Sequence, residues 1–105
     1  MLKRLDDTTF EKALGDNPLA LVMFYAPWAG PCNIARPSFT AAAMRFGNQM
    51  MFADFNLDDN PDIPEKYGVK AVPVFYLFVD GKPTVVKAGA ITPEAIIEIC
   101  ESALT

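Results

Sequence analysis

The stretch LALVMFY (residues 19–25) contains no charged residue and shows no alternation of apolar and polar positions. Continuous apolar character of this length is typical of a central strand in a sheet that helices cover on both faces. After a short loop, residues 32–46 predict a helix that contains Pro37, and residues 50–56 predict a second apolar strand. A strand, a helix and a strand in this order form a right-handed βαβ unit with parallel strands. The sequence therefore predicts an α/β core.

Shorter elements flank this unit on both sides. Their predicted ranges, in chain order, are a weak strand at 2–5, a helix through about Leu14, helical turns at 63–67, strands at 74–79 and 83–87, and a final helix after Thr92. Asp7 or Thr8 can cap the first of these helices, and Thr92 can cap the last. Asp80-Gly81 lies between two apolar stretches and is the strongest short hairpin signal in the chain. Because hairpin strands are antiparallel, we expect a mixed sheet.

Length and charge narrow the classes of function. The chain has 105 residues, which fits one domain over residues 1–105. Its net charge is −4, which argues against nucleic acid as a partner because phosphate binding needs excess positive charge. Five acids lie between residues 54 and 65, but they lack the glycine and the terminal glutamate of a calcium loop. We interpret this stretch as a solvated loop.

The content of cysteine and histidine excludes further chemistry. The chain has two cysteines, Cys32 and Cys100, and no histidine, so the usual zinc sites and imidazole catalysis are excluded. We expect no metal and no cofactor. The longest apolar stretch is far shorter than the ~20 residues that span a bilayer, so no membrane partner is expected. The N-terminus lacks the apolar core of a signal peptide, which favours a cytoplasmic location.

Cys32 is the first candidate for a reactive group. Sites in open α/β sheets gather beyond the carboxyl ends of the parallel strands, and the loop APWAGPC (residues 26–32) occupies that position. A cysteine that opens a helix lies at the positive end of the helix dipole, which favours thiolate over thiol. Taken without its neighbours, Cys32 is better interpreted as a small buried apolar residue.

The neighbours of Cys32 change that interpretation. The segment FYAPWAGPC (residues 24–32) resembles the active-site stretch of the thioredoxin superfamily, and its first half looks more like protein disulfide isomerase domains. Counterparts of further family positions are Pro37, Tyr67-Gly68-Val69, Val72-Pro73, Asp80-Gly81 and Gly89. The resemblance implies the α/β thioredoxin fold, with a mixed five-stranded sheet in the order 1-3-2-4-5 and helices on both faces.

The same resemblance implies a binding site for protein substrates. The Val72-Pro73 bond should be cis and lie beside the loop, and an extended peptide should add main-chain hydrogen bonds as in β-augmentation. The residues expected to form this site are Trp28, Gly30, Pro31, Val72, Pro73, Gly89 and Ala90. The implied partners are protein thiols and disulfides. An active parent protein, with both cysteines present, would take electrons from a thioredoxin-reductase-like donor. A monomer or a weak dimer is expected.

Three positions depart from the family pattern. The family's first cysteine attacks a substrate disulfide and the second resolves the mixed disulfide. Here Ala29 stands at the first position and Cys32 at the second. The buried aspartate and the lysine thought to assist proton transfer are replaced by Met23 and Asp54. Because alanine can neither ionise nor attack, dithiol turnover should be absent or severely impaired.

Two alternatives remain open from the sequence. The chain could be a redox-inactive binding or assembly module on the same fold, or a monothiol protein that acts through Cys32. A bridge between Cys32 and Cys100 is disfavoured, because their Cα atoms would have to lie within about 7 Å. Cys32 is predicted at the edge of the sheet and Cys100 two turns along the last helix, so we expect Cys100 to be a core residue.

Overall fold

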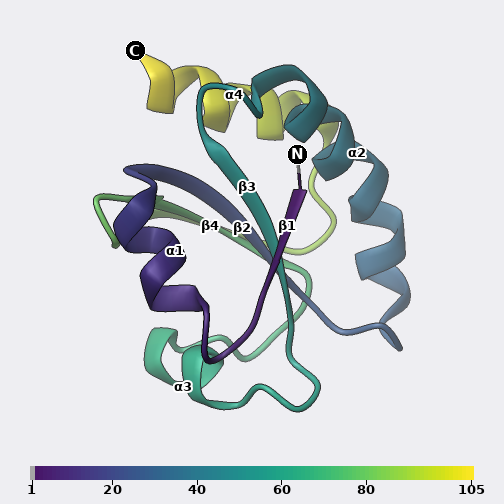
Figure 1. Ribbon diagram of the computed structural model, residues 1–105. Coiled ribbons are helices and arrows are strands. Elements are labelled where there is room, and N and C mark those ends of the chain that lie inside the picture. The colour runs from purple at the N-terminus through teal and green to yellow at the C-terminus, as the bar shows by residue number, and fades with distance from the viewer. Residues whose placement is uncertain (1) are drawn as a thin grey trace.

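A computed structural model describes residues 2–105 of the chain. Figure 1 shows its helices and strands. The elements, in chain order, are β1 (Leu2–Leu5), α1 (Phe10–Asp16), β2 (Leu19–Tyr25), α2 (Gly30–Phe46), β3 (Met51–Asn56), α3 (Asp62–Tyr67), β4 (Val74–Val79), β5 (Lys82–Ala88) and α4 (Pro93–Leu104). The predicted order of strands and helices is confirmed: β1, β2 and β4 have the predicted bounds, and the other boundaries differ by at most two residues.

The five strands form one mixed sheet in the order β1-β3-β2-β4-β5. β3 runs parallel to both β1 and β2, whereas β4 runs antiparallel to β2 and β5. β2 is central, and every residue from Ala20 to Tyr25 is buried. This arrangement confirms the predicted sheet order and the α/β fold class.

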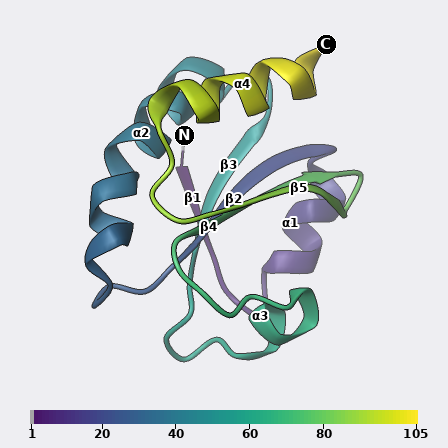
Figure 2. The same cartoon turned by 180° about the vertical axis from the view of Figure 1, so that it is seen from behind.

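Helices cover both faces of the sheet, with α2 and α4 on one side and α1 and α3 on the other (Figures 1 and 2). Alternate residues of β2 point into different cores, because successive side chains of a strand face opposite ways. Leu21 and Met23 join the core under α2 and α4, while Val22 and Phe24 join the other core. The absence of apolar–polar alternation in residues 19–25 follows from these two cores.

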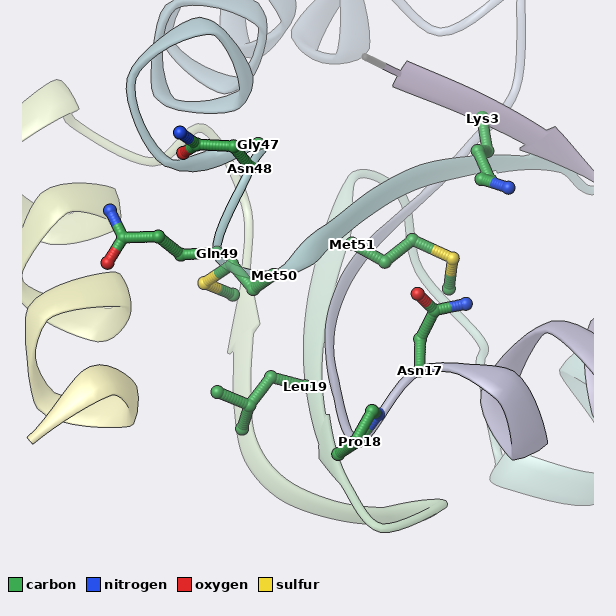
Figure 3. Close-up of a pocket in the computed structure, with 9 residues that line it drawn as sticks. All are labelled: Lys3, Asn17, Pro18, Leu19, Gly47, Asn48, Gln49, Met50 and Met51. Atoms are coloured by element: carbon green, nitrogen blue, oxygen red, sulfur yellow. The ribbon is translucent and has the colours of Figure 1, made fainter.

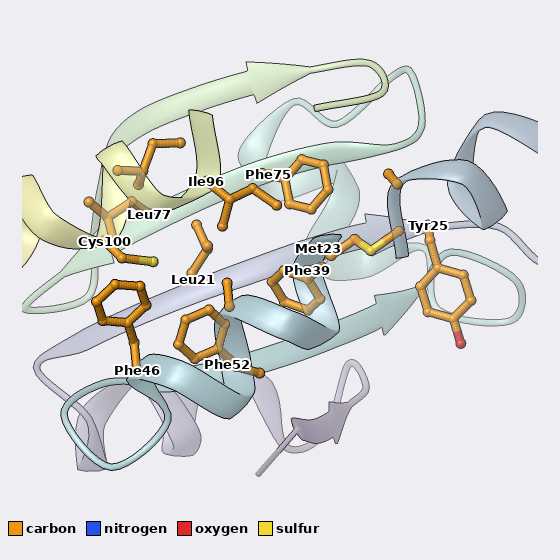
Figure 4. Packing of buried hydrophobic residues seen from close by; sticks show 14 of the residues in the cluster. Leu21, Met23, Tyr25, Phe39, Phe46, Phe52, Phe75, Leu77, Ile96 and Cys100 are labelled. Carbon is orange, nitrogen blue, oxygen red and sulfur yellow. The ribbon is translucent and has the colours of Figure 1, made fainter. Parts of the chain in front are cut away.

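Aromatic side chains fill the core between the sheet and α2 (Figure 4). Phe39 of α2 lies between two strand residues, with ring centroids 5.6 Å from Phe52 and 5.6 Å from Phe75. Cys100 of α4 is fully buried in the same cluster. This packing fixes α2 against the sheet and so positions the loop that precedes it.

The hairpin between β4 and β5 has the predicted turn. Asp80 has φ 52° and Gly81 has φ 80°, so both central residues adopt positive φ. Positive φ at both positions defines a type I′ turn, whose twist matches that of the flanking strands. The hairpin prediction is therefore confirmed.

Two predictions about helix starts are corrected. α2 begins at Gly30 and not at Cys32, because the proline at its second position is compatible with the first turn of a helix. The N-cap of α1 is Thr9, and neither Asp7 nor Thr8 caps that helix. The carboxylate of Asp7 instead accepts hydrogen bonds from the backbone N–H groups of residues 62 and 63, at the start of α3. The predicted cap at Thr92 is confirmed by a 3.1 Å hydrogen bond from the backbone N–H of Ala95.

Candidate functional site

A pocket of about 380 Å³ lies at the end of the sheet where β2 and β3 begin (Figure 3). The loop 26–32 follows β2 and therefore lies at the opposite end of that strand. The lining of the pocket includes Leu19, Met50 and Met51, and Lys3 is its one charged residue among those that the structure describes. No acid, cysteine or hydroxyl side chain faces this pocket within that part of the chain. Lys3 therefore has no acidic or nucleophilic partner in this pocket, and the loop 26–32 lies at the other end of the sheet.

The loop between β2 and α2 is held by its own backbone. The N–H of Ala29 donates to the carbonyl of Ala26 at 3.1 Å, and the N–H of Cys32 donates to the carbonyl of Ala29 at 3.1 Å. Ala29 is the N-cap of α2, with extended backbone angles. The first position of the predicted motif therefore lies at the start of the helix, and the second lies in its first turn.

Trp28 is the most exposed residue of this loop that carries a large side chain, and 75% of its surface is accessible. Its indole Nε1–H donates a hydrogen bond to Oδ1 of Asp58 at 3.3 Å. Asp58 belongs to the acidic stretch that we interpreted as a solvated loop, and its contact with Trp28 was not predicted. The bond orients an exposed aromatic ring beside the start of α2.

Ala29 and Cys32 face inward. Their exposed fractions are 9% and 2%, and both belong to the core cluster under α2 and α4. Cys32 is a free thiol. At 2% exposure, the sulfur of Cys32 cannot be reached by an external disulfide without displacement of the loop. Gly30 and Pro31, between the two positions, are exposed.

Two further loops complete the candidate site. The Val72–Pro73 peptide bond is cis, and half-buried Val72 packs against the cluster that contains Ala29 and Cys32. The N–H of Gly89 donates a 2.8 Å hydrogen bond to the carbonyl of Pro73. Gly89 and Ala90 are exposed. The structure thus joins the loop before β4 to the loop after β5 through one backbone bond.

Met23 and Asp54 are neighbours in the parallel register of β2 and β3. Met23 is fully buried in the core, and Asp54 is 1% exposed. The Asp54 carboxylate receives a guanidinium from each side: Arg36 Nη1 lies 3.0 Å from Oδ2, and Arg4 Nε lies 3.3 Å from Oδ1. The Arg36 guanidinium also lies over the ring of Tyr25, 4.6 Å from its centroid.

This ion cluster decides what Asp54 can do. Arg4 and Arg36 each bring a permanent positive charge to the carboxylate of Asp54. The hydrogen bond and the charge of Asp54 in turn raise the pKa of Arg4. Two positive charges therefore face the Asp54 carboxylate, and its oxygens accept hydrogen bonds from both arginines. The sequence pattern does not predict the two partners of Asp54. The one available signal is that Arg36 follows Cys32 by one helical turn, which places an arginine near the site.

Cys100 lies apart from this site. It is fully buried on α4, and it is a free thiol like Cys32, so the two cysteines form no bridge. Burial raises the pKa of Cys100 to about 11, because removal from water disfavours the thiolate. Its assignment as a core residue is confirmed.

Residues 2–105 lack two kinds of feature. No group of three His, Cys, Asp or Glu side chains in this range could hold a metal ion. Among the same residues, no helix has the length and the apolar character that a membrane crossing requires.

Comparison with known proteins supports the geometry of the fold. The family model described as Thioredoxin matches residues 1–102. A thioredoxin of Rhodospirillum rubrum is 35% identical and covers 98% of this chain and 100% of its own length. A thioredoxin of Pseudomonas aeruginosa is 35% identical over 82% of this chain and 81% of its own length. Protein disulfide isomerase-like 1-3 of Arabidopsis thaliana is 32% identical over 89% of this chain but only 16% of its own length.

Proposed function

Because this chain belongs to the thioredoxin family, we propose that it is a thiol–disulfide oxidoreductase of that family in which Ala29 has replaced the attacking cysteine. Dithiol turnover is then absent or severely impaired, and a scaffold that recognises protein partners remains. The observation that carries the proposal is the pairing of Ala29 at the N-cap of α2 with Cys32 in its first turn. The site keeps the positions of both thiols but only one sulfur.

The chemistry of the missing step is simple. An attacking thiolate would break a substrate disulfide, form a mixed disulfide and release one substrate thiol. The second thiolate would then attack the enzyme's first sulfur, close an intramolecular disulfide and release the other substrate thiol. Ala29 provides a methyl group where the first sulfur is needed, so the mixed disulfide cannot form there. Cys32 is 2% exposed, which makes it a poor substitute for the attacking group.

Recognition of an extended peptide needs no thiol. The proposed binding surface consists of Trp28, Gly30, Pro31, Val72, Pro73, Gly89 and Ala90. Support comes from the exposure of Trp28 and its hydrogen bond to Asp58. The backbone bond between Gly89 and Pro73 also supports it, because it holds two of the proposed segments at a fixed separation.

A second candidate function is a binding or assembly module without any redox role. One observation favours it: Asp54 is neutralised by Arg36 and Arg4, while Met23 offers no ionisable group. A chain released from redox duty has no need of a proton acceptor beneath Cys32. Under this alternative, partner binding survives the substitution Cys32→Ala.

Reduction of insulin disulfides distinguishes the two functions. With dithiothreitol as electron donor and its background subtracted, we expect the unaltered chain to be inactive and Ala29→Cys to restore turnover. Ala29→Ser is the matched control, because it adds a polar atom at the same place without a sulfur, and it should stay inactive. If Ala29→Cys folds but remains inactive, the binding module replaces the oxidoreductase as the better account.

A further inference from the structure

A groove lies on the side of α2 that faces β1. Its volume is about 580 Å³, and its lining includes Leu2 of β1 together with Thr40, Ala43, Met44 and Arg45 of α2. Met44 is 84% exposed, which is the largest value among the exposed large hydrophobic residues of the described chain. Covering a large apolar side chain at this exposure is favourable because it removes apolar surface from water, so the groove offers an apolar contact to a partner.

The ion cluster of Asp54 lies next along the same two elements. Arg4 follows Leu2 by two residues on β1, and Arg36 precedes Thr40 by one turn on α2. Two guanidinium groups share one carboxylate there, which leaves one excess positive charge in a chain of net charge −4. Asp6 follows the end of β1, and its carboxylate contacts the hydroxyl groups of Thr8 and Thr9, whereas the two arginines contact Asp54. The local charge therefore attracts an anion.

The two walls of this surface both lead to an arginine: β1 steps from apolar Leu2 to Arg4, and α2 leads from Met44 through Thr40 to Arg36. Alternate residues of a strand point to the same face about 7 Å apart, which applies to Leu2 and Arg4. Residues one turn apart on a helix are separated by about 6 Å along its axis, which applies to Thr40 and Arg36. A peptide in extended conformation repeats its side chains at the same spacing of about 7 Å.

β1 also provides a backbone surface. It lies at one edge of the sheet, and in residues 2–105 its only strand partner is β3. An edge strand presents unpaired N–H and C=O groups that can pair with an added strand. Side chains of an added strand alternate between the two faces, so its residues i and i+2 would face α2 together.

We propose that the surface of Leu2, Arg4, Arg36, Thr40 and Met44 binds an extended segment of a partner protein. The segment carries an apolar side chain and, two residues away, a carboxylate. The apolar group contacts Leu2 and Met44, and the carboxylate meets the excess positive charge of Arg4 and Arg36. This surface begins one helical turn beyond Cys32 and contains no residue of the loop 26–32, and the proposal does not depend on the proposed redox history of the chain.

Selection from a random heptapeptide library displayed on phage tests the proposal with the full chain as bait. We expect enriched peptides to carry an apolar residue spaced by two from Asp or Glu. Met44→Ser and Arg4→Gln should each lower the affinity of the chain for these peptides about fivefold or more. Arg4→Gln leaves Arg36 to neutralise Asp54, so the variant keeps the buried pair. Ile34→Ser is the matched control, since Ile34 lies on the same helix and is 72% exposed but does not line the groove.

Each other outcome overturns the proposal. These outcomes are an absence of enrichment, enriched peptides without an acidic residue, and equal retention by the groove variants and the control. Sedimentation of the unaltered chain supplies a separate check. If it forms a concentration-dependent dimer that Met44→Ser abolishes, the occupant of the groove is a second copy and the partner segment is excluded.

Discussion

Asp54 is the buried charged residue whose surroundings say most about how this chain departs from its family. It is 1% exposed and contacts guanidinium groups from β1 and α2, which are distant in sequence. A buried carboxylate is tolerated only where charge and hydrogen bonds compensate for lost water. Arg4 and Arg36 provide that compensation, and they tie two elements to β3.

We expect Asp54→Asn to lower the free energy of unfolding by about 1–3 kcal/mol, because two cations lose their shared counter-charge in a partly buried site. Urea denaturation measures the change. Asp59→Asn is the matched control: Asp59 is exposed with φ 64°, a conformation that asparagine accepts. Equal stability of the two variants would contradict a stabilising role for the cluster.

Cys100 gives the fold a dependence on alkaline pH. Its pKa is raised from 9.0 to about 11, chiefly by burial. Below the pKa of the unfolded chain the thiol is protonated in both states, so its contribution is constant. As pH rises further, the unfolded chain loses this proton first, and stability falls until the folded thiol also ionises.

Comparison with Cys100→Ala isolates this contribution. Between about pH 8 and pH 10.5, the free energy of unfolding of the unaltered chain should fall by about 1–2 kcal/mol more than that of the variant. Denaturant titrations at several pH values provide the difference. Parallel pH profiles would show that the Cys100 thiol ionises equally easily in both states.

At the scale of elements, the ends of helices depend on glycine only where the backbone requires it. Gly68 ends α3 with φ 71°, and its N–H donates to the carbonyl of Glu65. Gly15 lies inside α1, whose backbone has the ordinary helical hand. A Cβ atom at either glycine would meet no atom within 4 Å, so space does not distinguish them.

Alanine at these two positions should therefore act in opposite directions. Gly68→Ala should lower the free energy of unfolding by about 1 kcal/mol, because a Cβ atom disfavours positive φ. Gly15→Ala should raise it by about 0.5–1 kcal/mol, because alanine is the better helix former. Thermal denaturation compares both variants with the unaltered chain. A stabilising Gly68→Ala would be inconsistent with the left-handed cap of α3.

At the scale of the whole molecule, the sequence predicts the fold because its signals are local. The apolar run 19–25 indicates a doubly covered strand, and Asp80-Gly81 can adopt positive φ at both turn positions. The resemblance at residues 24–32 added the sheet order, which a single sequence does not otherwise provide. These features depend on residues that are close in the chain, so they can be predicted without knowledge of the packing.

The side-chain partners of the site were beyond such reasoning. Arg4 and Asp54 are separated by 50 residues, and Trp28 and Asp58 by 30. Both pairs exist only after the sheet has brought separate elements together. The cap of α1 was misassigned for the same reason, because Asp7 is occupied by the backbone of α3. Local capping propensity cannot show which of two distant backbone segments a side chain such as Asp7 will bind.

Under the proposed function, the folded chain presents no accessible attacking thiol. Alkylation by iodoacetamide at neutral pH, followed by intact mass, tests it directly. We predict no added group on the native chain, two after unfolding, and one on native Ala29→Cys, at the introduced sulfur. Rapid labelling of Cys32 in the native chain would contradict the claim and would make Cys32 the working nucleophile.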